Sequence, residues 1–199
     1  MEMIFVKEED AWKNKEQKKI FEGKHIYLRA VETDDLDDYY EYLSDPTTSR
    51  FTGTQKVFSR QAAASWIETI SKPDSSRVDL MIISQATGRL VGEVVLNDID
   101  PVNRSANIRI AIAGQANQGK GCGTEAMLLM LHHAFGTLNL HRVELSVYAF
   151  NDRAIHVYEK LGFKREGVQR DCLFWDHQYY DAVTMSILEH EFRKLHMPD

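Results

Sequence analysis

The sequence contains very little cysteine and no long hydrophobic run. Its two cysteines, Cys122 and Cys172, are too few for a disulfide framework or a cysteine-rich zinc site. No stretch reaches the ~18 consecutive apolar residues of a membrane-spanning helix, and the N-terminal residues lack the apolar core of a signal peptide. The eight histidines show no metal-binding spacing such as His-Glu-x-x-His. These absences predict a soluble, cytoplasmic protein without a metal site.

Basic residues are also few relative to acidic ones. With 24 basic against 30 acidic side chains, the formal net charge is −6, which argues against nucleic-acid binding because that function needs a basic face. Nearly all of the net charge lies in residues 25–50, where Arg29 and Arg50 oppose seven carboxylates: Glu32, Asp34, Asp35, Asp37, Asp38, Glu41 and Asp45. This segment predicts either a solvated helix face or a surface that attracts cations.

A chain of 199 residues suits one domain with a single core. Residues 1–23, which are rich in charge of both signs, predict an N-terminal helical extension, and residues 24–199 are the predicted domain. Helical periodicity marks residues 36–43, 59–70, 124–135 and 151–161. Alternation predicts about seven strands, at residues 25–31, 78–84, 90–99, 107–113, 142–148, 164–175 and 179–188. This order indicates an α/β (α+β) fold with a mixed sheet flanked by helices.

The most informative segment lies between a predicted strand and a predicted helix and reads Gln118-Gly119-Lys120-Gly121-Cys122-Gly123-Thr124. Alternate glycines let the backbone turn tightly and direct several N–H groups to one point. The helix N-terminus adds unsatisfied donors and the positive end of its dipole. The segment therefore predicts a site for a phosphate or pyrophosphate, with a plain strand-to-helix turn as the alternative.

Two nucleotide-binding motifs fit this segment poorly. The spacing from Gly114 to Lys120 matches a P-loop, but Gly121 replaces the Ser or Thr that holds magnesium. The dinucleotide fingerprint Gly-x-Gly-x-x-Gly fails because Thr124 occupies the place of its third glycine. The sequence therefore disfavours a P-loop nucleotide hydrolase and a dinucleotide-binding enzyme.

Two motifs together resemble the GNAT superfamily of acetyl-CoA-dependent N-acetyltransferases. Residues 118–123 are similar to the family's Gln/Arg-x-x-Gly-x-Gly/Ala loop, and residues 151–163 supply a second motif, Asn-Asp-Arg-Ala-Ile-His-Val-Tyr-Glu-Lys-Leu-Gly-Phe. The chain looks most like the ribosomal-protein N-terminal and spermidine acetyltransferase branches. The resemblance covers residues 24–188 and implies the GNAT fold, with a mixed, mostly antiparallel central sheet.

The resemblance also implies a reaction, in which the acetyl group of acetyl-CoA moves to a primary amine by direct attack in a ternary complex. The implied acceptor is a protein N-terminus, a polyamine or another small amine, whereas nucleic acids and membranes are not expected partners. A CoA-binding sensor without turnover is the alternative function, and the sequence leaves the formation of a homo-oligomer open. In this family the carboxylates of residues 25–50 would border the acceptor, where they steer a cation or form a solvated face.

The residues implied to bind CoA fall into three groups. The backbone at the end of one strand would pair with the pantetheine amides, the glycine loop would hold the pyrophosphate, and the next helix would contact the pantetheine arm. The alternative role of Asn151 is to cap the N-terminus of that helix. The complete set is Ile110, Ala111, Ile112, Gln118, Gly119, Lys120, Gly121, Cys122, Gly123, Thr124, Asn151, Arg153 and Tyr158.

Acetylation of an amine requires a base for the ammonium and an acid for the leaving thiolate. The resemblance implies Tyr158 as the acid, with a core aromatic as the alternative. Asn107 stands where many members have a glutamate base. Asp98, which matches an acidic position in the spermidine-type pattern, is therefore the first candidate base and Glu93 the second. The alternatives are an Asp-x-Asp-Pro turn at Asp98 and a chain of waters in place of a single base.

Overall fold

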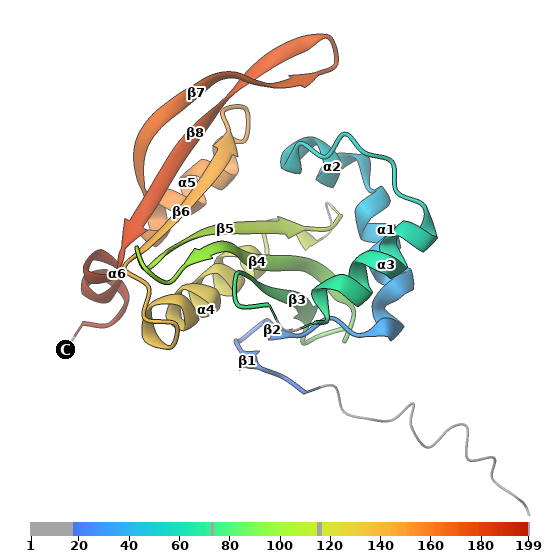
Figure 1. The fold of residues 1–199 in the computed structure, drawn as a ribbon, viewed down its shortest axis with the longest axis horizontal. Helices are drawn as coiled ribbons and strands as arrows, with labels where there is room; N and C mark the ends of the chain where they lie inside the picture. Colours follow the sequence, from blue (N-terminus) through green and yellow to red (C-terminus); the bar gives the residue numbers. More distant parts are fainter. Residues whose placement is uncertain (1–17, 73, 115–116, 199) are drawn as a thin grey trace, which may run out of the picture.

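The computed structural model describes residues 18–72, 74–114 and 117–198, and within them eight strands form one sheet (Figure 1). The strand order is β1-β2-β3-β4-β5-β6-β8-β7. Every neighbouring pair is antiparallel except β5 and β6, which are parallel. The strands are β1 Phe21–Glu22, β2 Ile26–Arg29, β3 Val78–Ser84, β4 Leu90–Asp100, β5 Ser105–Ile112, β6 Arg142–Tyr148, β7 Lys164–Trp175 and β8 Gln178–Leu188.

Helices cover both faces of the sheet. In chain order they are a 3-10 turn at Thr33–Asp35, α1 Leu36–Ser44, α2 Pro46–Thr52, α3 Arg60–Ile70, α4 Cys122–Gly136, α5 Asp152–Leu161 and α6 Glu189–His196. Buried side chains of α4 pack on one face, which we call the α4 face. Those of α1 and α3 pack on the other, the α1 face. None of these helices, within the described ranges, combines the length and the apolar character needed to cross a bilayer.

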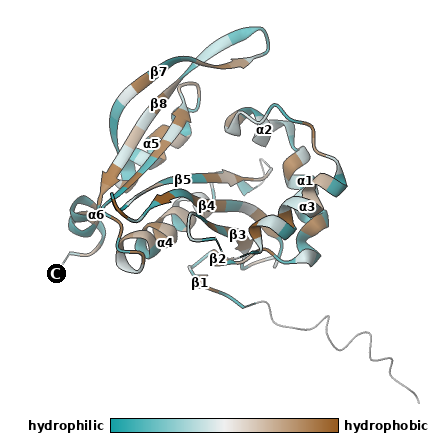
Figure 2. Cartoon of the chain, in the orientation of Figure 1, coloured by the Kyte–Doolittle hydropathy of each residue, from teal (hydrophilic) through white to brown (hydrophobic). Residues whose placement is uncertain are grey.

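The central strands separate the two layers by alternation of their side chains. Leu80 and Ile82 of β3 belong to the α4-face core, whereas Met81 and Ile83 belong to the α1-face core. Side chains directly opposite on paired strands point to the same face, so Glu93, which pairs with Met81, lies on the α1 face. Figure 2 shows hydrophobic residues along these central strands, whereas much of β7 is hydrophilic.

This architecture confirms the predicted fold class, with eight strands in place of about seven. The structure contains three elements that the sequence did not predict: β1, α2 and α6. Strand β1 falls within the predicted helical extension, but Phe21 pairs with Leu28 of β2, so this part of the segment joins the sheet. Residues 1–17 of the predicted extension lie outside the described residues.

Helix α2 begins at the point where the sequence predicted only the end of α1. The Asp45 carboxylate accepts hydrogen bonds from the backbone N–H groups of Thr47 (3.2 Å) and Thr48 (3.1 Å), so it caps a new helix. Pro46 occupies the first helical position, where its missing N–H costs nothing. Gly53 then ends α2 with a positive φ of 68°. The Asp-Pro pair therefore turns the chain from one helix directly into another.

Candidate functional site

Strands β5 and β6 separate after a short stretch of parallel pairing. Only Ser105↔Arg142, Ala106↔Val143 and Asn107↔Glu144 are paired between them. From Ile108 onward, β5 has no pairing with β6 among the described residues, although β6 stays paired with β8 as far as Tyr148. One edge of β5 therefore presents backbone N–H and C=O groups that need partners.

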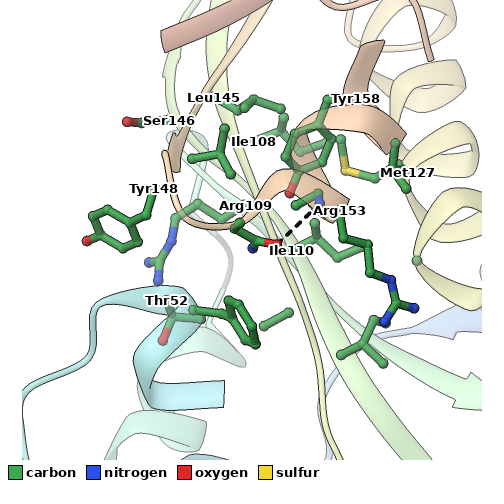
Figure 3. A pocket seen from close by; sticks show the side chains of 18 of the residues that line it. Thr52, Ile108, Arg109, Ile110, Met127, Leu145, Ser146, Tyr148, Arg153 and Tyr158 are labelled. Atoms are coloured by element: carbon green, nitrogen blue, oxygen red, sulfur yellow. Dashed lines mark hydrogen bonds between the residues drawn. The ribbon is translucent and has the colours of Figure 1, made fainter. Parts of the chain in front are cut away.

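The separated strands border a cavity of about 840 Å³. It reaches both faces of the sheet, because its lining includes Ile110, which packs against the α4-face core, and Ala111, which packs against the α1-face core. Figure 3 shows Leu145 near Ile108, and Tyr148 with Arg109 in another part of the same cavity. This volume suits a small molecule or the arm of a larger one.

The loop before α4 lines this cavity. Gly119 and Gly121 have positive φ values of 79° and 86°, a backbone conformation that favours glycine. Gly121 is the N-cap of α4, so no side chain caps the first N–H groups of the helix. A β-carbon at Gly121 would meet no atom within 4 Å, which shows open space above the loop. The loop and the helix N-terminus therefore suit an anion such as a phosphate.

The structure brings all but one of the predicted cofactor residues to the cavity. Lys120 is exposed and is the exception. Arg153 donates a 3.2 Å hydrogen bond to Gln118, which joins α5 to the glycine loop. Asn151 accepts a 3.2 Å hydrogen bond from the N–H of Ala154, so it caps α5. The residues of the set that line the cavity are Ile110, Ala111, Ile112, Gln118, Gly119, Gly121, Cys122, Gly123, Thr124, Asn151, Arg153 and Tyr158.

Tyr158 lines the cavity from α5 and packs against the α4-face core. Its ring lies 6.0 Å from that of Phe163, centroid to centroid. Burial raises the pKa of the Tyr158 hydroxyl to about 12, because the phenolate would lose its hydration. The hydroxyl is therefore protonated at neutral pH and can donate a hydrogen bond to a group in the cavity.

Glu93 lines the same cavity from β4, on the α1 face. Its carboxylate accepts hydrogen bonds from the hydroxyls of Tyr39 (3.0 Å) and Tyr42 (3.1 Å), and Trp66 donates in turn to Tyr39 (3.2 Å). Burial raises the pKa of Glu93, and the two tyrosine hydroxyls and the charge of Arg109 oppose that rise. A buried carboxylate with a raised pKa accepts a proton more readily than an ordinary one.

Asp98 does not lie with these residues. It is exposed and occupies an irregular part of β4, where the pairing with β5 shifts between Asn97 and Asp100. Its φ of 53° is unusual for a residue with a side chain, and its carboxylate accepts a 2.5 Å hydrogen bond from Asn97. Asp98 is absent from the cavity lining, so of the two candidate bases only Glu93 is brought close to the separated strands.

Sequence reasoning missed several other side chains at the site. Of the two tyrosines on Glu93, Tyr39 was predicted only as part of the buried face of residues 36–43, and Tyr42 was not singled out. Arg109 was not singled out, although alternation along β5 places it on the same face as Ala111. Phe51 and Phe150 also line the cavity, with ring centroids 6.1 Å apart, and Phe51 belongs to the unpredicted α2.

The acidic residues 25–50 do not form the wall of the cavity, since none of the seven carboxylates is among its lining residues. Asp35 makes a buried, bidentate ion pair with Arg29, at 2.6 and 2.7 Å. Four others have partners at the surface or at a helix end: Asp37 pairs with Arg60, Asp38 and Glu41 pair with Arg89, and Asp45 caps α2. These contacts favour the interpretation as a solvated helix face.

Comparison with known proteins places the chain in one family. A family model described as an acetyltransferase (GNAT) domain matches residues 25–164. The chain belongs to the GNAT acetyltransferases. It is therefore an acetyl-CoA-dependent acyltransferase, with acetyl-CoA as its cosubstrate.

Two curated relatives of this GNAT protein cover most of its length. A spermidine N(1)-acetyltransferase of Escherichia coli (strain K12) is 29% identical over 171 residues, which are 86% of this chain and 90% of the relative. A putative ribosomal N-acetyltransferase of Bacillus subtilis is 32% identical over 177 residues, covering 85% and 94%. Both agree with the two branches that the sequence motifs resemble.

A solved structure supports the same assignment. The crystal structure of spermidine N-acetyltransferase from Vibrio cholerae, in complex with CoA and spermine, matches with a TM-score of 0.78 and 26% identity. The match covers 85% of this chain and 99% of that one. The GNAT fold therefore extends over nearly all of the described residues.

Proposed function

We propose that this protein transfers the acetyl group of acetyl-CoA to a primary amine by direct attack in a ternary complex. The observation that carries the proposal is the separation of β5 from β6. It creates one cavity that contains a free strand edge, a glycine loop, a protonated tyrosine and a buried carboxylate.

The lining residues fit CoA in two places. The unpaired edge of β5 at residues 110–112 offers backbone groups for the two amides of the pantetheine arm, as an added strand would. The N–H groups at the start of α4 suit the pyrophosphate, and Gly121 leaves open space there. Cys122 is buried in the first turn of α4, which suits packing rather than nucleophilic attack.

Glu93 is our proposed base. An alkyl ammonium with a pKa of about 10.4 needs about 4–5 kcal/mol to lose its proton at pH 7. Glu93 lies on the α1 face of the cavity, and its raised pKa favours acceptance of that proton. Tyr39 and Tyr42 fix both of its carboxylate oxygens in place. The deprotonated amine then attacks the thioester carbonyl and forms a tetrahedral intermediate.

Tyr158 is our proposed acid. When the intermediate collapses, the C–S bond breaks and the sulfur gains negative charge. The Tyr158 hydroxyl, held protonated by burial, donates a hydrogen bond and then its proton to that sulfur. Its position on α5, seven residues after the Asn151 cap, puts both side chains on the side of the helix that lines the cavity.

Polyamines are the acceptors that we propose to test first. The E. coli relative is named for spermidine, and the V. cholerae structure contains spermine together with CoA. A protein N-terminus is the second class, because the B. subtilis relative is named as a putative ribosomal N-acetyltransferase. Both classes present a primary or α-amine that Glu93 can deprotonate.

The test is release of free thiol from acetyl-CoA in the presence of spermidine, spermine or short peptides. Because Cys172 is a free and exposed thiol, protein without acetyl-CoA sets the baseline for the thiol reagent. Thiol release that depends on an amine, with initial-rate lines that intersect when both substrates are varied, supports direct transfer. Parallel lines contradict the ternary complex. CoA binding without thiol release for any amine supports the alternative, a CoA-binding sensor.

A further inference from the structure

The α1 face of the cavity carries a positive charge beside the proposed base. On the paired strands β4 and β5, Glu93 is opposite Ala111, and Val95 is opposite Arg109. Arg109 is thus a diagonal neighbour of Glu93 on the same face, at a distance of about 7–8 Å between backbones. Both residues line the cavity, and Figure 3 shows the Arg109 guanidinium close to Tyr148 and Thr52.

The Arg109 guanidinium is available to a ligand. It is exposed and, within the described part of the chain, it makes no hydrogen bond and no ion pair. Several other arginines differ from it: Arg29, Arg60, Arg77 and Arg142, for example, are paired with carboxylates. A guanidinium carries five N–H donors in a fixed plane that matches a carboxylate group.

A second cation continues this positive region outside the cavity. Arg50 lies over the ring of Phe150, with its guanidinium carbon 5.3 Å from the ring centroid, and it too makes no ion pair within the described residues. It borders a smaller hollow whose lining shares Phe51 and Phe150 with the main cavity. Because the acidic residues 25–50 are absent from the lining of both, no carboxylate of that segment neutralises this region from within.

We propose that Arg109 determines acceptor specificity, by favouring an amine that has a carboxylate within a few bonds over a polyamine. The proposal rests on the proposed function, since it places the acceptor amine at Glu93. From there, Arg109 is close enough to hold a carboxylate of the same acceptor. A peptide with an acidic residue beside its N-terminus has this arrangement of charges. Spermidine instead brings further ammonium groups, which Arg109 repels.

The experiment compares three acceptors with wild-type protein and with Arg109→Gln and Arg109→Lys. The acceptors are spermidine and two peptides that begin Ser-Asp or Ser-Asn and are otherwise identical. Wild-type protein is expected to prefer the acidic peptide by about tenfold in kcat/KM, which is slightly more than one charge–charge contact contributes in bulk water. Arg109→Gln is expected to remove that preference and to raise kcat/KM for spermidine severalfold. Arg109→Lys, which keeps the charge, retains most of the preference.

A matched control removes an arginine elsewhere. Arg193 lies on α6 and pairs with Glu189, and it lines neither hollow, so Arg193→Gln should leave all three acceptors unchanged. Far-UV circular dichroism verifies that each variant is folded. The proposal is overturned if the ratio of kcat/KM for the acidic peptide to kcat/KM for the neutral peptide is the same in wild-type protein and in Arg109→Gln.

A binding measurement separates this proposal from the proposed function. Calorimetry measures the affinity of the two peptides for the CoA-bound protein, where no transfer takes place. If no amine is acetylated, the proposed function fails, and the binding ratio still tests Arg109. A tenfold preference that Arg109→Gln removes supports the proposal, and equal binding of both peptides by wild-type protein overturns it.

Discussion

Replacing Glu93 with glutamine tests the proposed base and predicts a specific dependence on pH. At pH 7 about 0.04% of an amine with a pKa of about 10.4 is uncharged. Glu93→Gln must rely on that fraction, so kcat/KM should fall by about 10²- to 10³-fold, within the range of general-base catalysis. The fraction of free amine increases about tenfold per pH unit. The ratio of the wild-type kcat/KM to that of the variant should therefore fall by a similar factor per pH unit up to about pH 10.

The assay is thiol release measured from pH 5 to pH 10 with spermidine as the acceptor. Since burial raises the pKa of Glu93, the wild-type rate should decline on the acid side at a pH above 4.3, the ordinary value for glutamate. Asp98→Asn is the matched control, because Asp98 is exposed and does not line the cavity. A deficit that stays constant across the pH range refutes the role as base, and a large loss in Asp98→Asn would transfer that role to Asp98.

The same substitution should not destabilise the protein at neutral pH. Folding favours the protonated form of a carboxyl group whose pKa is higher in the folded protein than in the unfolded one. The contribution of that group to stability is therefore present below the unfolded pKa and is lost as pH rises through the folded pKa. Folding therefore disfavours the ionised form of Glu93, a cost that glutamine does not carry. A Tm for Glu93→Gln that equals or exceeds the wild-type value separates lost chemistry from lost structure.

Substitutions at Tyr158, Gly121 and Asp35 test the proposed acid, the glycine loop and the buried ion pair. Tyr158→Phe should lower kcat by at least about 10²-fold with CoA affinity unchanged by calorimetry, and an unchanged kcat removes Tyr158 from the acid role. Gly121→Val should abolish CoA binding while circular dichroism shows a folded protein, because φ there is 86° and the valine would enter the open space above the loop. Asp35→Ala should cost about 3–5 kcal/mol in urea unfolding, since it leaves the Arg29 charge buried without its partner, and a loss under 1 kcal/mol contradicts that estimate.

The sequence predicted most of the fold because alternation and capping are local signals. Ser59 caps α3 and Asn151 caps α5, as the residue patterns indicated. Helix α2 was missed because a proline shortly after residues 36–43 is typical of a helix end, whereas the side chain of Asp45 makes the same position a start. Strand β1 was missed because its two residues pair with β2 through backbone hydrogen bonds that leave no pattern in the side chains.

The candidate site was predictable only as far as motifs extend along the chain. The glycine loop and Tyr158 belong to contiguous motifs, and both line the cavity. The choice between Asp98 and Glu93 depended instead on a local irregularity of β4, which places Asp98 at a positive φ and outside the cavity. The link from Glu93 to Tyr39 and Tyr42 joins residues about fifty positions apart, which no single-sequence pattern reveals.

Charge has two different roles in this protein, and only one of them concerns the acceptor. Five of the seven carboxylates in residues 25–50 pair with Arg29, Arg60 or Arg89 or cap a helix, which is a structural role. Any attraction that they exert on a cation from the surface is weakened by salt within about 8–10 Å. Glu93 and Arg109 line the cavity itself, where screening is weaker and where we propose that the reacting amine lies. We therefore expect the selection of the acceptor to depend on this one pair of opposite charges more than on the net charge of −6.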